Sequence, residues 1–141
     1  MFALQSVIID TELQLKAERN EKAMAVEIET DAEKMTVFLS GDIDHCTASH
    51  IRAEIDRAIR GAPINRLILD FSQVTFMDSS GIGLVLGRYK LISELGGSCT
   101  VSNPPDYIAK VMRLSGIGKL CEIIFDRSIR QRVHGEADKG Y

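Results

Sequence analysis

The residues best suited to chemistry are small and polar, and they stand close together near the middle of the chain: Asp78, Ser79, Ser80, Gly81 and Gly83. If they open a helix, the backbone N–H groups around them lack intrahelical partners and carry the positive end of the helix dipole. A hydroxyl placed there lies beside a natural anion site and could carry a phosphate without unfolding the domain. Asp and Ser are also ordinary helix caps, and glycines can simply allow close packing. From the residues alone, capping is the simpler interpretation.

The surrounding sequence predicts that this cluster joins a strand to a helix. The continuously apolar run 67–69 is typical of a strand covered on both sides. After Asp78, apolar residues recur at the spacing of one helical face until Gly96 and Gly97 end the helix. The predicted inner positions are Ile82, Val85, Leu86, Tyr89 and Ile92. Ser80 is therefore expected in the first helical turn.

The preceding part of the domain predicts a hairpin and another helix. Apolar and acidic residues alternate over 26–29, and a second strand is predicted to end at Gly41. Asp44 can cap the next helix, which Gly61 ends. The apolar face of that helix consists of Ala48, Ile51, Ile55, Ala58 and Ile59.

The C-terminal part predicts two more strands, at 99–101 and 123–125, each followed by a helix. Asn103 is the predicted cap of the first of these helices, with Pro104 in its first turn and Gly116 at its end. Its predicted inner stripe is Ile108, Val111 and Met112. The final helix would be capped by Asp126 or Ser128 and would carry Ile129 and Val133.

These elements follow the order β-β-α-β-α-β-α-β-α, which predicts an α/β fold. Alternating strands and helices favour a sheet that is parallel over most of its extent, with helices packed against it, and the opening hairpin makes the sheet mixed. The predicted domain spans residues 23–134. An N-terminal appendage (1–22) precedes it and a flexible tail (135–141) follows.

Composition argues against several classes of partner and cofactor. The 141 residues carry a net charge of -3, so neither nucleic acid nor an anionic membrane is an expected partner. No apolar run approaches the roughly 20 residues that span a bilayer, and the start lacks a signal peptide, so the protein is expected in the cytoplasm. The three cysteines are odd in number and unpaired in spacing, which predicts buried reduced thiols rather than disulfides or a metal site. We expect no cofactor.

Three enzymatic interpretations fit poorly. A dinucleotide-binding loop needs Gly or Ala at the position that Leu86 occupies after Gly81 and Gly83. The motif of serine hydrolases is absent, and no histidine is convincingly placed to pair with a serine. No Gly-Lys-Ser/Thr of a phosphate-binding loop follows the glycines. The chain is therefore not expected to be an enzyme, although weak nucleotide binding near Ser79 stays open.

A longer stretch around the serines resembles a known family. The sequence Phe-Met-Asp-Ser-Ser-Gly-Ile-Gly of residues 76–83, with Gly-Arg-Tyr-Lys at 87–90, is similar to the signature of the anti-sigma-factor antagonists, and most similar to their sporulation type. Further agreement comes from Leu-Asp-Phe at 69–71, Gly-Asp-Ile-Asp-His at 41–45 and Arg-Leu-Ser-Gly at 113–116. The resemblance covers roughly residues 24–133 and implies the fold called the STAS domain.

The resemblance implies a partner-switching cycle. The unphosphorylated protein would bind an anti-sigma factor that is also a serine kinase, and this binding would release the sigma factor. The kinase would then phosphorylate Ser79, and a serine phosphatase would reset the switch. The partner-contact residues carried over from the family are Asp44, Asp78, Ser79, Ser80 and Gly81.

The resemblance also leaves one alternative of another class. STAS-like domains serve as scaffold parts of stress-signalling assemblies and as regulatory components of transport systems. The Asp-Ser-Ser-Gly sequence and the single-domain length favour the sigma switch. The sequence does not identify the sigma factor, the oligomeric state or the role of residues 1–22.

Overall fold

The computed structural model describes residues 25–129, so the predicted appendage (1–22), the predicted tail (135–141) and Val133 lie outside the described residues. The first two strands, β1 (Ala25–Asp31) and β2 (Lys34–Ile43), form the expected antiparallel hairpin. β2 does not end at Gly41 as predicted. Gly41 has a φ of 92° and lies at a shift in the pairing register, so the strand bulges there and continues to Ile43.

The remaining strands extend the sheet in chain order. β3 (Arg66–Met77), β4 (Ser98–Ser102) and β5 (Glu122–Ile124) each pair in parallel with the strand before them, giving the order β1-β2-β3-β4-β5. The predicted α/β class and the mixed, mostly parallel sheet are confirmed.

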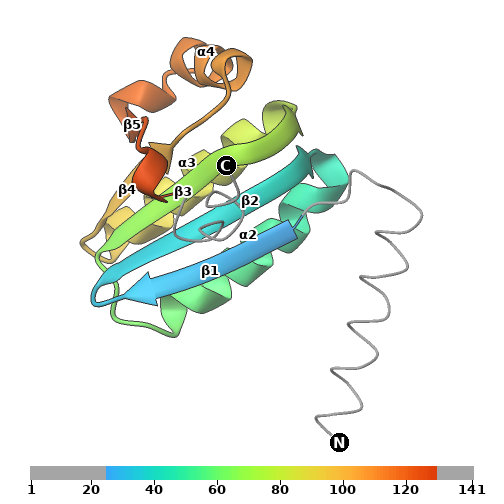
Figure 1. Cartoon of the computed structure of the whole chain (residues 1–141). Coiled ribbons are helices and arrows are strands. Elements are labelled where there is room, and N and C mark those ends of the chain that lie inside the picture. The colour runs from blue at the N-terminus through green and yellow to red at the C-terminus, as the bar shows by residue number, and fades with distance from the viewer. Residues whose placement is uncertain (1–24, 130–141) are drawn as a thin grey trace, which may run out of the picture.

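Two long helices, α2 (His45–Arg60) and α3 (Ser79–Glu94), pack against one face of this sheet (Figure 1). The predicted apolar face of α2 is the buried one, because every third or fourth residue turns toward the sheet. The chain leaves α3 through Gly96, whose φ of 85° favours glycine. The core joins strand and helix residues, among them Val37, Leu69, Val101, Ile51, Ile55 and Val85.

A shorter helix, α4 (Asp106–Leu114), lies at one end of the sheet and leads into the 3-10 turn η1 (Ile117–Lys119) (Figure 1). Val111 was predicted to point inward, but its side chain is exposed, while Ile108, Ala109 and Met112 are buried. One of the three predicted inner residues is therefore wrong, since Ala109 is buried in place of Val111. So short a helix presents only a narrow face to its neighbours. Gly116, with a φ of 91°, follows the helix end as predicted.

The predicted cap at Asn103 is wrong. The residue before α4 is Pro105, and no side chain caps this helix. Asn103 instead takes a φ of 56°, and its amide donates to Asp70 at 2.9 Å and to the carbonyl of Asp126 at 2.9 Å. The buried Asp70 carboxylate also accepts hydrogen bonds from Ser72 and Ser102. This polar junction ties β3 and β4 to the segment after β5.

Asp126 rather than Ser128 opens the last helical segment, because its carboxylate accepts from both the backbone N–H and the hydroxyl of Ser128. These two hydrogen bonds lower the pKa of the Asp126 carboxyl. The helix begins at residue 127 and continues to the end of the described residues.

The cysteines differ from the expectation in one case. Cys99 and Cys121 are buried free thiols, as predicted, but Cys46 at the start of α2 is exposed. A hydrogen bond to Cys121, together with burial, raises the pKa of the Cys99 thiol.

Candidate functional site

The sheet brings the two helix starts together. β2 and β3 end at Ile43 and Met77, which are partners in the parallel register, and an aspartate follows each of them. The backbone N–H of Asp78 donates to the carbonyl of Ile43 at 3.1 Å, which joins the two strand ends directly. Asp44 and Asp78, predicted from separate parts of the sequence, therefore belong to one surface.

The start of α2 is fully capped by its own side chains. The Asp44 carboxylate accepts from the backbone N–H groups of Cys46 and Thr47, both at 2.9 Å. The Thr47 hydroxyl oxygen in turn accepts from the Asp44 backbone N–H at 2.9 Å, which completes a capping box. Asp44 caps α2 and is also a predicted partner contact. These two roles are compatible, because the residue is only half-buried and lies beside Asp78.

The start of α3 is less closed. The Asp78 carboxylate accepts only from the Ser80 backbone N–H, at 2.8 Å, and the Gly81 backbone N–H bonds to the Asp78 carbonyl at 3.0 Å. Gly81 occupies the third helical position, where a capping box needs a side chain, so no reciprocal bond can form.

Ser79 is the first residue of α3, and its side chain is exposed. The first turn of α3 contains no acidic side chain, so the Asp78 carboxylate at the cap is the acidic group of α3 at the positive end of its dipole. Ser80 follows in the first turn, as predicted, and is half-buried. The geometry therefore places a hydroxyl in solvent at a site that favours negative charge.

Gly81 has a packing role that the sequence could not separate from a functional one. It is buried, and a Cβ on it would collide with the Met77 side chain. Gly83 is different, because it is exposed and a Cβ there would meet no atom within 4 Å. Of the five predicted partner-contact residues, Gly81 is the one whose own surface is covered.

Gly83 helps to line a hollow of about 320 Å³ between the N-terminal halves of α2 and α3. Ser80 borders it from α3, while His45 and Arg52 border it from α2. Gly83 belongs to the predicted polar cluster, but neither it nor His45 or Arg52 was predicted as a partner-contact residue. The sequence pattern that could have identified the α2 members is a polar helical face, on which His45, Ser49 and Arg52 recur at spacings of four and three.

A buried ion pair holds the two helices together farther along. The guanidinium of Arg88 on α3 lies 2.8 Å from the carboxylate of Asp56 on α2, and both side chains are largely covered. Burial lowers the pKa of Arg88, and the charge of Asp56 opposes that change. Sequence reasoning did not anticipate a buried arginine here, since arginine is rarely buried.

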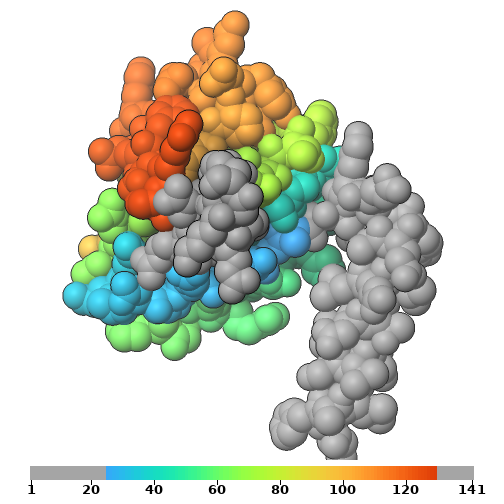
Figure 2. All heavy atoms as spheres, viewed as in Figure 1, coloured from blue at the N-terminus to red at the C-terminus, as the bar shows by residue number. Residues whose placement is uncertain are grey.

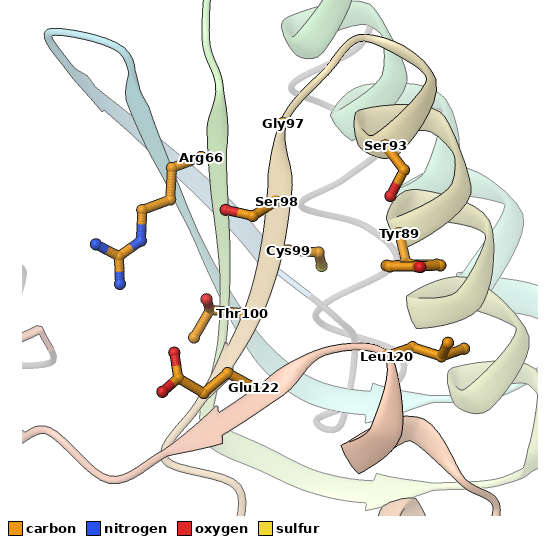
Figure 3. A pocket seen from close by; sticks show the side chains of 9 residues that line it. All are labelled: Arg66, Tyr89, Ser93, Gly97, Ser98, Cys99, Thr100, Leu120 and Glu122. Atoms are coloured by element: carbon orange, nitrogen blue, oxygen red, sulfur yellow. The ribbon is translucent and has the colours of Figure 1, made fainter.

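A second hollow, of about 560 Å³, lies away from the helix starts, beside β4 (Figure 3). Figure 3 shows Tyr89 and Ser93 extending from α3 on one side of β4, while Arg66 and Glu122 lie on the other side. No predicted site residue lines it. Among residues 25–129, no group of His, Cys, Asp or Glu side chains could hold a metal ion, and no helix is long and apolar enough to cross a membrane.

Comparison with known proteins agrees with the fold and with the sequence resemblance. Residues 23–134 match the model of the STAS domain. The chain belongs to this family. A curated STAS relative, the anti-sigma F factor antagonist of Paenibacillus polymyxa, is 37% identical over 102 residues, which cover 71% of this chain and 86% of the relative.

Solved structures of related STAS proteins show the same arrangement. The anti-sigma factor antagonist SpoIIAA in its unphosphorylated form is 34% identical and superposes with a TM-score of 0.65 over 79% of this chain and 97% of its own. The Bacillus cell fate determinant SpoIIAA in the phosphorylated form is also 34% identical, with a TM-score of 0.60 over 77% of this chain and 99% of its own. That relative therefore exists in two phosphorylation states.

Proposed function

We propose that this chain is an anti-sigma factor antagonist, and that phosphorylation of Ser79 switches off its binding to an anti-sigma factor. The observation that carries the proposal is the exposed Ser79 hydroxyl at the first position of α3, next to the start of α2. Membership of the STAS family and the two forms of SpoIIAA support it.

The proposed contact surface consists of the two helix starts. Ser79 would lie within it, Ser80 and Asp78 beside it, and Asp44 on the neighbouring helix. Gly81 would contribute indirectly, since its missing side chain lets Met77 pack beneath the loop. We assign this role to residues 23–134 and none to the segments 1–22 and 135–141.

A phosphate would act at this surface through charge. Phosphoserine adds roughly -1.5 to -2 charges, and a partner docked over Ser79 must either strip water from that dianion or face it with its own carboxylates. Each 1.4 kcal/mol of penalty weakens binding about tenfold, so a modest penalty is enough for a switch. No refolding of the domain is required.

The proposed cycle has three further parts. The anti-sigma factor would itself be the kinase that modifies Ser79, a serine phosphatase would remove the phosphate, and the exchange would take place in the cytoplasm. The chain itself would be a substrate and a binding partner rather than an enzyme, with no cofactor of its own.

Titration calorimetry with the source organism's anti-sigma F factor homologue tests the switch. Ser79→Ala should bind like the unaltered chain, and Ser79→Asp should bind at least about tenfold more weakly. Ser93→Asp is the matched control, because it adds the same charge to an exposed serine at the far end of α3. Equal affinity of Ser79→Asp and the unaltered chain would contradict the electrostatic account.

Incubation with that homologue and ATP, followed by mapping of the modified residue, tests the kinase step. We expect one phosphate per chain, on Ser79. Modification of a distant residue would contradict the proposal, and turnover of nucleotide by this chain alone would instead indicate an enzyme.

A further inference from the structure

The outward face of α4 is apolar. Tyr107, Val111 and Leu114 follow one another at spacings of four and three, and their side chains are 48%, 40% and 78% exposed. The opposite face of the same helix is buried against the rest of the domain. A helix that is apolar on both faces has one face without a partner in this structure, and such exposed patches mark interaction surfaces.

This apolar face continues toward the start of α3. Phe76, near the end of β3, is 47% exposed and stands two residues before Asp78. The Tyr107 hydroxyl donates to the carbonyl of Thr75 at 3.1 Å, which holds the beginning of α4 against the end of β3. Figure 2 shows orange α4 at the top of the molecule, with the yellow-green end of β3 and start of α3 beside it.

We call the side chains of Phe76, Tyr107, Val111 and Leu114 the α4 patch. Its charged neighbours on the helix are the exposed Lys110 and Arg113, with Asp106 at the first position. The arginine also lies over the ring of Phe125, 6.0 Å from its centroid. The border of the patch is therefore more basic than acidic, whereas the whole chain has a net charge of -3.

We propose that the α4 patch is a second contact with the anti-sigma factor, and that it receives apolar side chains bordered by acidic ones. The inference rests on the proposed function, because continuity with Ser79 is what selects this occupant. The α4 patch and the helix start at Ser79 would then have different roles in binding. Apolar side chains buried at an interface supply affinity, whereas a phosphate on Ser79 supplies the charge that opposes binding.

Binding to the anti-sigma F factor homologue, measured by titration calorimetry on the full chain, tests the patch. The double variant Val111→Ser/Leu114→Ser should lose about tenfold or more in affinity. Leu95→Ser is the matched control, because Leu95 is 55% exposed but follows the far end of α3, and its affinity should not change. The single variant Leu114→Ser, at the most exposed position of the patch, serves if the double variant melts at a lower temperature than the control.

The outcomes separate the two proposals. If the patch variants bind like the unaltered chain while Ser79→Asp does not, the α4 patch is overturned and the switch stands. If the unaltered chain does not bind the homologue, both are overturned. Sedimentation of the unaltered chain and of each variant tests whether a second copy of this chain occupies the patch instead. If the unaltered chain is a dimer and the double variant is a monomer, the patch is a contact between copies, and the proposal is overturned.

Discussion

The starts of α2 and α3 use the same residue type at the same place, yet they are finished differently. Each follows the end of a parallel strand, and each has an aspartate in extended conformation as its cap. At the start of α2, Asp44 and Thr47 form a capping box of reciprocal hydrogen bonds. At the start of α3, the Asp78 carboxylate accepts one hydrogen bond, from the Ser80 N–H, and the exposed Ser79 follows it. The difference suggests that the first start serves stability and that the second leaves its positive end available to a ligand or a phosphate.

The two glycines of α3 should give the largest contrast in stability. Gly81→Ala forces a Cβ into the buried Met77 side chain, and overpacking of this kind costs about 1–3 kcal/mol. Gly83→Ala fits into open space and should stabilise the helix by up to about 1 kcal/mol. Urea unfolding of both variants measures the difference. Equal stabilities would mean that the α3 start is not packed as tightly as the structure indicates.

The Gly83→Ala variant also tests whether the partner binds in the hollow between α2 and α3. Gly83→Ala places a methyl group at the wall of this hollow without disturbing Met77. If the anti-sigma factor enters the hollow, this stabilised variant should bind it more weakly, which separates binding from folding.

Replacing Asp44 should have the next largest effect. Asp44→Ala removes both side-chain cap bonds, and we expect a loss of about 1–2 kcal/mol in the free energy of unfolding. Asp44→Asn keeps an acceptor for these bonds but removes the charge, so its stability should stay close to that of the unaltered chain. If Asp44→Asn is stable but binds the anti-sigma factor more weakly, the charge serves the partner as well as the helix.

Asp78→Ala should cost less than Asp44→Ala, about 0.5–1 kcal/mol, because only the bond to the Ser80 N–H is lost. Thermal unfolding of the two alanine variants under identical conditions gives the ranking. A larger loss at Asp78 would reverse the comparison between the two starts and would assign the α3 cap a structural role as well.

Local pattern was sufficient to predict these two starts, and it failed where the partners are distant in sequence. The spacing of apolar residues identified the buried face of α2. On α3 it found Val85 and Ile92, but the predicted inner positions Ile82, Leu86 and Tyr89 are only half-buried, while the buried residues include Gly81, Leu84 and Arg88. Asp78 was placed at the start of the right helix. Asn103 looked like a cap because prolines follow it, but its actual partners, Asp70 and Asp126, lie 33 and 23 residues away. Nothing in one stretch of sequence reports such a contact.

The site was predicted in the same uneven way. The exposed serine follows from the helix start, which is a local property. The hollow beside it depends on how α2 lies against α3, so His45 and Arg52 became members of the site only when the packing was known. The buried Arg88 was quoted as part of a motif, yet its partner Asp56 belongs to another helix.

The smallest expected effect is that of the phosphate on stability, and it is the most informative about the switch. A phosphate on Ser79 would lie at the positive end of α3, where a negative charge stabilises a helix by about 0.3–1 kcal/mol at low ionic strength, and the neighbouring Asp78 carboxylate would reduce that gain. The melting temperature of the phosphorylated chain should therefore be equal to or slightly above that of the unmodified chain. The gain should shrink in 1 M salt, where the Debye length falls to about 3 Å.

A phosphorylated chain that melts several degrees lower would indicate that the modification works by loosening the domain. Loss of partner binding without loss of stability would instead indicate that the charge acts only at the contact surface. The control is phosphate-free Ser79→Ala, which should melt like the unaltered chain because the Ser79 hydroxyl is exposed and the capping bond is made by Asp78. The α3 start would then be a place where charge changes binding while the fold stays as it is.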